Sequence, residues 1–346
     1  MIDSTPWIRA PKAELHCHLE LAVRPSTLRE FACQTGLDVS TDAAFEEAFL
    51  IRNPMGNLTE VLHKFLHTRD VLASENLMER VAFEICEDFH LNANVRVLEL
   101  RYAPSFLLDV HDGMTADGLH GAIVRGIRRA ESVYPMRVGL ICILQRTKST
   151  KDNAYWTDFA ISNRDTFVAL DLADDETQEK PEPFIPLFQR AKAAGLGITI
   201  HAGEPAVPDI EKNIRVAIEQ MGADRIGHGV QAIQDEAIVQ LLIDTQIPLE
   251  MCPTSNWLTG AVSEFKLHPL PLYHRAGVIT TINTDDPTVM CTDLHNEISR
   301  LNEECGLAPD ELETILENGR RVTFLDSTAV ESVWHDSPPP NGDAYI

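Results

Sequence analysis

The sequence predicts a closed (β/α)8 barrel, a single α/β domain over residues 1–335 with a helical lid inserted after the first strand. Eight short apolar runs alternate with helical patterns, 346 residues suit one large barrel, and no linker divides the chain before an expected loose tail at residues 336–346. A doubly wound open sheet is the alternative. It would need a glycine-rich loop after the first strand, where Leu19-Glu20-Leu21-Ala22 contains no glycine.

Each expected strand is an apolar run too short for a helix. The run from Val138 to Leu144 has no polar face, as expected where helices cover both faces of a sheet. The eight expected strands are residues 13–20, 97–102, 138–144, 167–172, 197–201, 225–230, 248–252 and 278–283.

The expected helices show apolar residues at intervals of three and four. They are residues 25–36, 57–67, 76–89, 118–132, 183–194, 210–221, 237–244, 271–276, 293–305 and 309–322. The second of these places Leu58, Val61, Leu62 and Phe65 on one face. That face either packs on the core or forms the lid over an apolar pocket.

Composition favours a folded protein that acts on small molecules. Hydrophobic residues make up 44% of the chain, which excludes disorder as its main state. The formal net charge of −24 would repel nucleic acid, whose phosphates are bound by clustered Lys and Arg. We therefore expect a small-molecule partner and no nucleic acid. The sequence does not predict an oligomeric state.

The cysteines and the first residues indicate a reduced, cytoplasmic protein. The seven cysteines are scattered, and none belongs to a Cys-x-x-Cys pair. Residues 1–7 lack the basic start and the apolar stretch of a secretory signal, and we expect no membrane-spanning segment.

Two histidines in the first strand form half of a candidate metal site. His16 and His18 are two residues apart, so in a strand both imidazoles project from the same face. Imidazole is a good ligand for zinc. Most His-x-His pairs have no such role, so the inference depends on the other strand ends.

Three more strand ends carry groups that bind metal or move protons, and in a barrel these ends form the active site. The fifth strand ends in His201 and Glu204, the sixth in His228, and the eighth in Asp285 and Asp286. Separately, His228 between two glycines could be a turn residue, Glu204 a solvated acid, and the two aspartates a helix N-cap. Their shared position favours a site.

The group predicts a hydrolytic zinc centre with one Zn²⁺ per chain. His16, His18, His201 and Asp285 would be the ligands. Zinc lowers the pKa of a bound water to about 7. His228 would take a proton from that water or hold it by a hydrogen bond, and Glu204 would act as an acid on the substrate. Asp286 would meet a ring nitrogen.

The sequence resembles the adenosine deaminase family of the metal-dependent amidohydrolases. The matching motifs are PKAELHCHLE (11–20), LTEVLHKF (58–65), ELRYAP (99–104), DLADDE (171–176), HAGE (201–204), RIGHGV (225–230), LEMCPTSN (249–256) and NTDDP (283–287).

The resemblance implies hydrolytic deamination at C6 of an adenine nucleoside, adenosine or 2′-deoxyadenosine. It implies that Glu204 protonates N1, that His228 orients and deprotonates the water, and that Asp286 meets N7. It also implies that Leu58, Val61, Leu62 and Phe65 form the lid over the ribose.

Two positions depart from the family pattern on the substrate side. Glu20-Leu21 stands where the family usually has Asp-Gly, and Asp174 stands where it usually has glycine. Glu20 would face the 5′-hydroxyl, His18 would border the same side, and Asp174 would offer its N–H to N3 beside a crowding Cβ. A modified adenine nucleoside such as aminodeoxyfutalosine, or adenine itself, is therefore an alternative substrate.

Other classes fit less well. A polynucleotide deaminase of the other zinc fold would show His-x-Glu together with Pro-Cys-x-x-Cys, and the second of these motifs is absent from the sequence. A hydrolase of amides or phosphoesters usually needs a second metal, for which no strand end offers a bridging lysine. A non-catalytic relative would not need the full set of polar strand ends.

Overall fold

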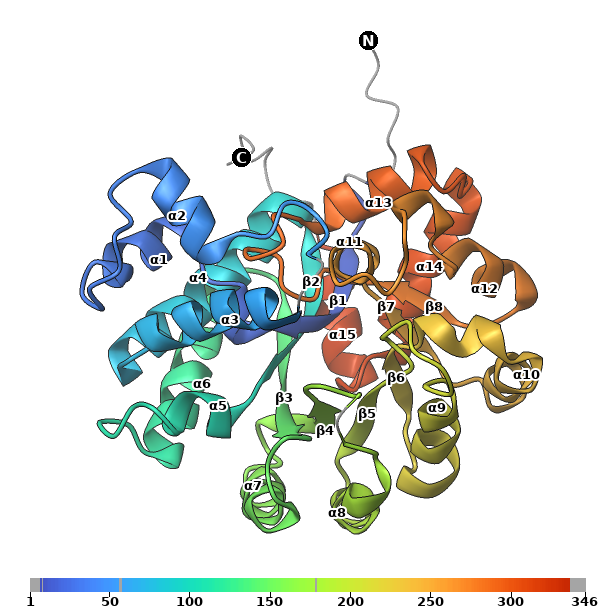
Figure 1. Ribbon diagram of the computed structural model, residues 1–346, viewed down its shortest axis with the longest axis horizontal. Helices are drawn as coiled ribbons and strands as arrows, with labels where there is room; N and C mark the ends of the chain where they lie inside the picture. The colour runs from blue at the N-terminus through green and yellow to red at the C-terminus, as the bar shows by residue number, and fades with distance from the viewer. Residues whose placement is uncertain (1–6, 8, 56–57, 178, 337–346) are drawn as a thin grey trace.

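A computed structural model describes residue 7 and residues 9–55, 58–177 and 179–336, without the side chains of residues 58–60, 62 and 63. Eight parallel strands form one sheet in the order β1 to β8 (Figure 1). The strands are β1 (Lys12–His18), β2 (Val95–Tyr102), β3 (Arg137–Gln145), β4 (Phe167–Ala173), β5 (Gly197–Ala202), β6 (Arg225–His228), β7 (Leu249–Met251) and β8 (Thr280–Ile282).

The sheet closes into a barrel just beyond β8. Cys17 and Asp285 form a parallel bridge, in which the N–H of Asp285 donates to the carbonyl of His16 (2.9 Å) and the N–H of His18 donates to the carbonyl of Asp285 (2.9 Å). The fold is therefore the expected (β/α)8 barrel. Closure also places Asp285 beside both histidines of β1.

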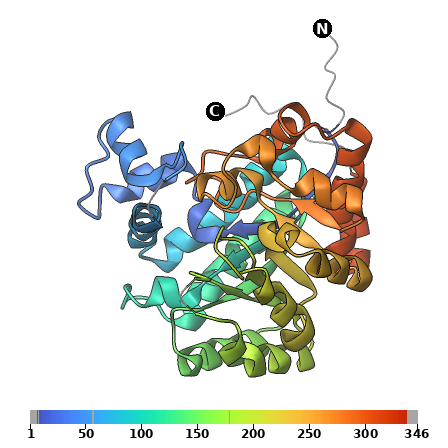
Figure 2. The same ribbon diagram turned by 45° about the vertical axis from the view of Figure 1, so that its right-hand side comes forward.

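Helices cover the outside of the barrel. Those after β2 are α5 (Pro104–Leu108), α6 (Ala116–Val133), α7 (Thr150–Ser162), α8 (Ile185–Ala193), α9 (Lys212–Val216), α10 (Glu236–Thr245), α11 (Pro253–Leu258), α12 (Leu270–Ala276), α13 (Leu294–Glu303), α14 (Pro309–Val322) and α15 (Ser327–Trp334). Four more lie between β1 and β2, and Figures 1 and 2 show α1 and α2 projecting at one side: α1 (Pro25–Ala32), α2 (Asp42–Phe49), α3 (Leu58–Val71) and α4 (Glu75–Ala93).

The expected strands and helices are all present with shifted ends, and five helices were not expected: α2, α5, α7, α11 and α15. Helix α7 was not expected because its buried face includes the polar Asn153 and Thr157, so the sequence shows no apolar stripe there. Asn153 is buried there because its side chain exchanges two hydrogen bonds with the backbone of Gln145 at the end of β3. The expected helix over residues 210–221 changes from α-helix to π-helix at Ala217.

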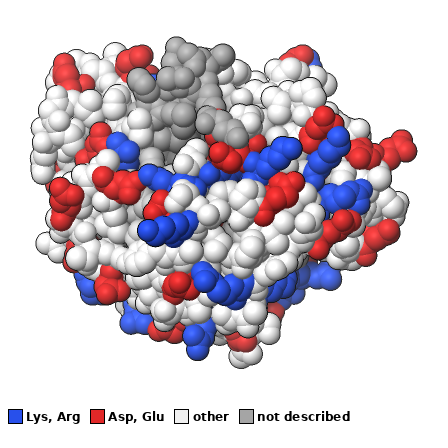
Figure 3. All heavy atoms as spheres, turned by 60° about the horizontal axis from the view of Figure 1, so that its bottom comes forward, with Lys and Arg blue, Asp and Glu red and all other residues white. Residues whose placement is uncertain are grey.

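Several further expectations concern the whole chain. All eight strands share one sheet. The single domain over residues 1–335 stays a prediction. Residues 337–346 of the expected tail lie outside the described part. All seven cysteines are free. Within the described part, no helix combines the length and apolarity that crossing a bilayer requires. On the face drawn in Figure 3, acidic and basic side chains are interspersed.

We expect Gly126→Ala to destabilise the packing of α6 on α4. A Cβ at Gly126 would lie 2.3 Å from the carbonyl oxygen of Glu79, so the helices would have to separate. Such overpacking costs about 1–3 kcal/mol. The control is Gly121→Ala on the same helix, where the nearest atom is 3.5 Å away and alanine favours the helix. A midpoint of thermal unfolding for Gly126→Ala that equals or exceeds that of Gly121→Ala would contradict this packing.

Candidate active site

A pocket of about 300 Å³ opens at the carboxyl ends of the strands. The predicted site residues that line it come from β1 (His18), β5 (His201), β6 (His228) and the segment after β8 (Asp285). His16 lies beneath them and is fully buried. Residues from distant parts of the sequence thus meet because parallel strands end on the same side of a barrel.

The metal-binding atoms of these residues converge. The Nε2 atom of His16 lies 3.1 Å from Nε2 of His201 and 3.4 Å from Oδ1 of Asp285, and that oxygen lies 3.2 Å from Nε2 of His18. Ligand atoms at about 2.0–2.1 Å from a tetrahedral zinc would be about 3.3–3.4 Å apart. These three distances are close to that spacing. His16, His201 and Asp285 form one cluster of possible ligand atoms together with His228, whereas His18 is grouped with Asp285 and Asp286. The assignment of His18 as the fourth ligand therefore stays a prediction.

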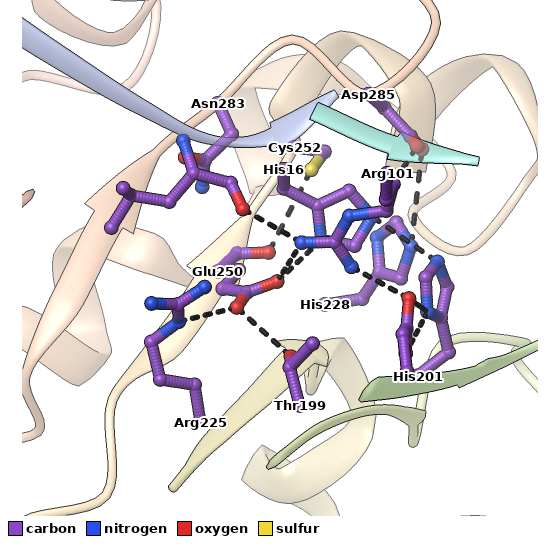
Figure 4. Close-up of polar contacts among 12 residues, drawn as sticks. His16, Arg101, Thr199, His201, Arg225, His228, Glu250, Cys252, Asn283 and Asp285 are labelled. Atoms are coloured by element: carbon purple, nitrogen blue, oxygen red, sulfur yellow. Dashed lines mark hydrogen bonds and ion pairs between the residues drawn. The ribbon is translucent and has the colours of Figure 1, made fainter. Parts of the chain in front are cut away.

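Two buried carboxylates set the orientation of the imidazoles, and Figure 4 shows one of them, Glu250, beside His16. Nδ1 of His16 lies 2.7 Å from Oε2 of Glu250, and Nδ1 of His201 lies 3.0 Å from Oδ2 of Asp171. A carboxylate can only accept, so each Nδ1 carries the hydrogen and each Nε2 presents a lone pair. Two lone pairs that face each other across 3.1 Å repel unless a cation lies between them. The donor set fits a divalent metal.

Arginines keep these carboxylates ionised. Arg101 donates to Oδ2 of Asp171 (2.8 Å) and to Oε2 of Glu250 (2.7 Å), and Arg225 donates to Oε1 of Glu250 (2.6 Å). Burial opposes ionisation of Glu250, but the two arginines and His16 hold its pKa well below the usual range. The pKa of Asp171 is low for similar reasons, with burial opposed by His201 and Arg101.

Histidine 228 faces the same space from β6. Its Nε2 lies 3.8 Å from Oδ2 of Asp285 and 3.7 Å from Oε2 of Glu204. Burial lowers the pKa of His228, so the ring is neutral near pH 7. The preceding Gly227 is required by space, because a Cβ there would lie 3.0 Å from the ring of His16. His228 itself adopts a left-handed backbone with φ of 61°.

Two acids beside this group have pKa values above their usual range. Enclosure in the pocket, followed by the charge of Asp285, raises the pKa of Glu204 to about 7. Burial and Asp285 raise the pKa of Asp286 well above its usual range. Oδ1 of Asp286 is buried without a hydrogen-bond partner among the described residues, and Asp286 lines the pocket.

The predicted substrate wall surrounds the pocket. Glu20, Asp174, Val61 and Phe65 line it. Glu20 accepts the N–H of Ala103 (2.8 Å), and burial raises its pKa to about 7. The side chains of Leu58 and Leu62 lie outside the described part. Val61 and Phe65 pack in an apolar cluster with Leu21, Ile51, Leu258, Val289 and Met290, as a lid would.

Comparison with known proteins assigns the family. The model of the family described as "Adenosine deaminase" matches residues 11–335. An adenosine deaminase of Serratia proteamaculans is 36% identical over 327 residues, 94% of this chain and 96% of the relative. The chain belongs to the adenosine deaminase family. It is a hydrolytic deaminase.

Two solved structures share the fold of this adenosine deaminase family member. A zinc-bound amidohydrolase of Burkholderia ambifaria is 26% identical with a TM-score of 0.85, covering 94% of this chain and 89% of that one. The N6-methyl-AMP deaminase of Arabidopsis thaliana is 28% identical with a TM-score of 0.80, covering 94% and 96%.

Sequence reasoning missed the groups that orient the predicted ligands, Asp171 and Glu250, and their partner Arg101. A signal was present, because each is a charged residue inside a strand that the fold buries. A charge at such a position must be paired in the barrel interior. The sequence could not say which charges pair.

We expect Glu250→Gln to weaken divalent metal binding by about 10–100-fold, because an amide no longer fixes the tautomer of His16. Apo protein titrated with Zn²⁺ against a chromophoric chelator measures this. Glu297→Gln is the control, since Glu297 is equally buried but its partners are Thr254 and Thr292. Equal affinities in the two variants would contradict the orienting role of Glu250.

Proposed function

We propose that this enzyme is a zinc-dependent deaminase of adenine nucleosides, which converts adenosine or 2′-deoxyadenosine into inosine or 2′-deoxyinosine and ammonia. The observation that carries the proposal is the convergence of the His16 and His201 lone pairs on Asp285, beside two acids whose pKa values are raised. Membership in the adenosine deaminase family supports the reaction.

One Zn²⁺ per chain would be held by His16, His18, His201 and Asp285, and it would make water reactive by lowering its pKa to about 7. The remaining chemistry belongs to side chains. Glu204 would deliver a proton to N1 of the purine while oxygen adds at C6. A carboxyl with a pKa of about 7 can both donate and recover a proton at neutral pH.

Asp286 would bind N7. A ring nitrogen such as N7 only accepts hydrogen bonds, so its partner must donate. A raised pKa keeps Asp286 protonated and able to donate, and its Oδ1 has no other described partner. Binding N7 and N1 from two sides would hold C6 toward the metal ligands.

The charge of the pocket favours nucleosides over nucleotides. Its acidic lining residues are Glu20, Asp174, Asp175, Glu176, Glu204, Asp285 and Asp286. No Lys or Arg is among the lining residues in the described part. A phosphate is usually bound by such cations, and the described lining residues offer it none. This separates the proposed substrate from the monophosphate named for the Arabidopsis neighbour.

We expect Glu204→Gln to retain zinc while losing about 10²–10⁴-fold in kcat, because an amide cannot deliver the proton to N1. Elemental analysis should give one zinc per chain in both proteins. Glu182→Gln, at an exposed glutamate outside the pocket, is the control. A normal rate for Glu204→Gln would remove Glu204 from the mechanism, and active protein without zinc would contradict the ligand assignment.

A substrate panel separates the alternatives. Adenosine, 2′-deoxyadenosine, adenine, aminodeoxyfutalosine, AMP and N6-methyl-AMP would be compared by loss of the adenine absorbance band. We expect the unphosphorylated nucleosides to have the highest kcat/KM. The kcat/KM of AMP should be lower by about tenfold or more, because each unfavourable contact of about 1.4 kcal/mol lowers the rate about tenfold. Preference for a monophosphate would contradict the charge argument.

A further inference from the structure

A chain of buried hydrogen bonds runs behind the active site and ends on His228. Nε2 of His268 lies 3.1 Å from Oδ1 of Asn256. The amide nitrogen Nδ2 of Asn256 lies 3.0 Å from Nδ1 of His228 and 3.4 Å from Oε1 of Glu204. His268 and Asn256 come from the segment after β7 and are buried, and neither was a predicted site residue.

The direction of this chain is fixed at its far end. The backbone N–H of Leu270 can only donate, and it points at Nδ1 of His268 (3.3 Å). Nδ1 of His268 must therefore be bare, and its hydrogen must be on Nε2, which donates to Asn256. Burial, with His228 nearby, lowers the pKa of His268 to about 3, so this ring does not carry a second proton.

The orientation of the Asn256 amide is supported from its other side as well. The reversed amide would direct Oδ1 at the carboxylate oxygen of Glu204 and would direct an N–H at the N–H of His268. Both contacts would be repulsive. With the amide as described, Asn256 donates one hydrogen to Nδ1 of His228 and the other to Oε1 of Glu204.

We propose that Asn256 and His268 are positioning residues that lock His228 as the Nε2–H tautomer, so that His228 donates a hydrogen bond to the attacking oxygen and does not deprotonate it. This inference rests on the proposed function, and it decides between the two roles that the sequence left open for His228. A neutral ring that already carries hydrogen on Nε2 has no lone pair there with which to accept a proton.

The same amide also organises Glu204. Because Asn256 donates to Oε1, the acidic proton of Glu204 is placed on Oε2, the oxygen that lies 3.7 Å from Nε2 of His228. Once Glu204 has given this proton to N1, two carboxylate oxygens near that Nε2 can take the proton lost by the attacking water, the freed Oε2 of Glu204 and Oδ2 of Asp285. Each proton then has a donor and an acceptor without His228 as a base.

The direct test is the tautomer in the zinc-loaded wild-type enzyme. Nitrogen NMR of protein labelled with ¹⁵N-histidine distinguishes a bare ring nitrogen from a protonated one, and His228→Asn and His268→Gln identify the two signals by their loss. We expect both rings to be protonated at Nε2 and bare at Nδ1. A His228 ring protonated at Nδ1 would overturn the inference.

Kinetics test the consequence. Asn256→Asp presents only acceptors and would force hydrogen onto Nδ1 of His228; we expect kcat to fall about 10²–10⁴-fold with KM nearly unchanged, as for other catalytic histidines held in the wrong tautomer. His268→Leu should also lower kcat, whereas His268→Gln retains a donor and should restore most of it. Equal kcat for the Leu and Gln variants would contradict the relay.

The control is His120→Leu. His120 is also buried and bonded, to Tyr102 and Thr166, but it belongs to α6 and has no contact with the relay. We expect it to lower stability and not kcat. Inactivity of the wild type on adenine nucleosides would refute the proposed function while the NMR result still decides the tautomer, so the two failures are distinguishable.

Discussion

The active site depends on imidazole N–H groups that are bound to buried carboxylates. Glu250 and Asp171 hold Nδ1 of His16 and His201, and this contact alone turns both Nε2 lone pairs to one point. An unpaired carboxylate in a barrel interior is unfavourable. Arg101 pairs with both carboxylates, because its planar guanidinium donates to Asp171 and to Glu250 at the same time. The imidazoles of the predicted metal site thus lie directly above a buried ion network.

This network extends from the site to the opposite end of the barrel. Arg225 joins Glu250 to Glu99, and Glu99 accepts from the backbone N–H of Phe324, which follows α14. The guanidinium of Arg225 also lies 3.7 Å from the ring centroid of Phe324. Strands β2, β4, β6 and β7 therefore each contribute a buried charge whose partner comes from another strand, and these pairs favour one register of the barrel as well as one orientation of the imidazoles.

The sequence could predict the features that depend on local chain geometry or on the fold as a whole, and not those that depend on contacts between particular atoms. His16 and His18 could be paired from the sequence because strand alternation is local, and the eight strand ends could be aligned because the fold fixes where they meet. Asn256 and His268 could not be assigned, because their role depends on which atom of each faces which neighbour. The same limit applies to α7. Its Asn153 is buried because it forms a hydrogen bond with the backbone, which an apolar pattern does not predict.

The two departures from the family pattern lie outside the ion network. The residues expected to set substrate specificity are therefore separate from those that orient the imidazoles. Glu20 is held by a backbone N–H of residue 103, and Asp174 by Thr147, by Gln145 and by the N–H of Asp175. Within the described residues, neither side chain forms a hydrogen bond with a predicted metal ligand. Asp174 also adopts φ of 85°, a conformation that suits glycine and that its own carboxylate contacts stabilise. Substitutions at these two positions can reshape the sugar side of the pocket while the lone pairs of His16 and His201 still converge.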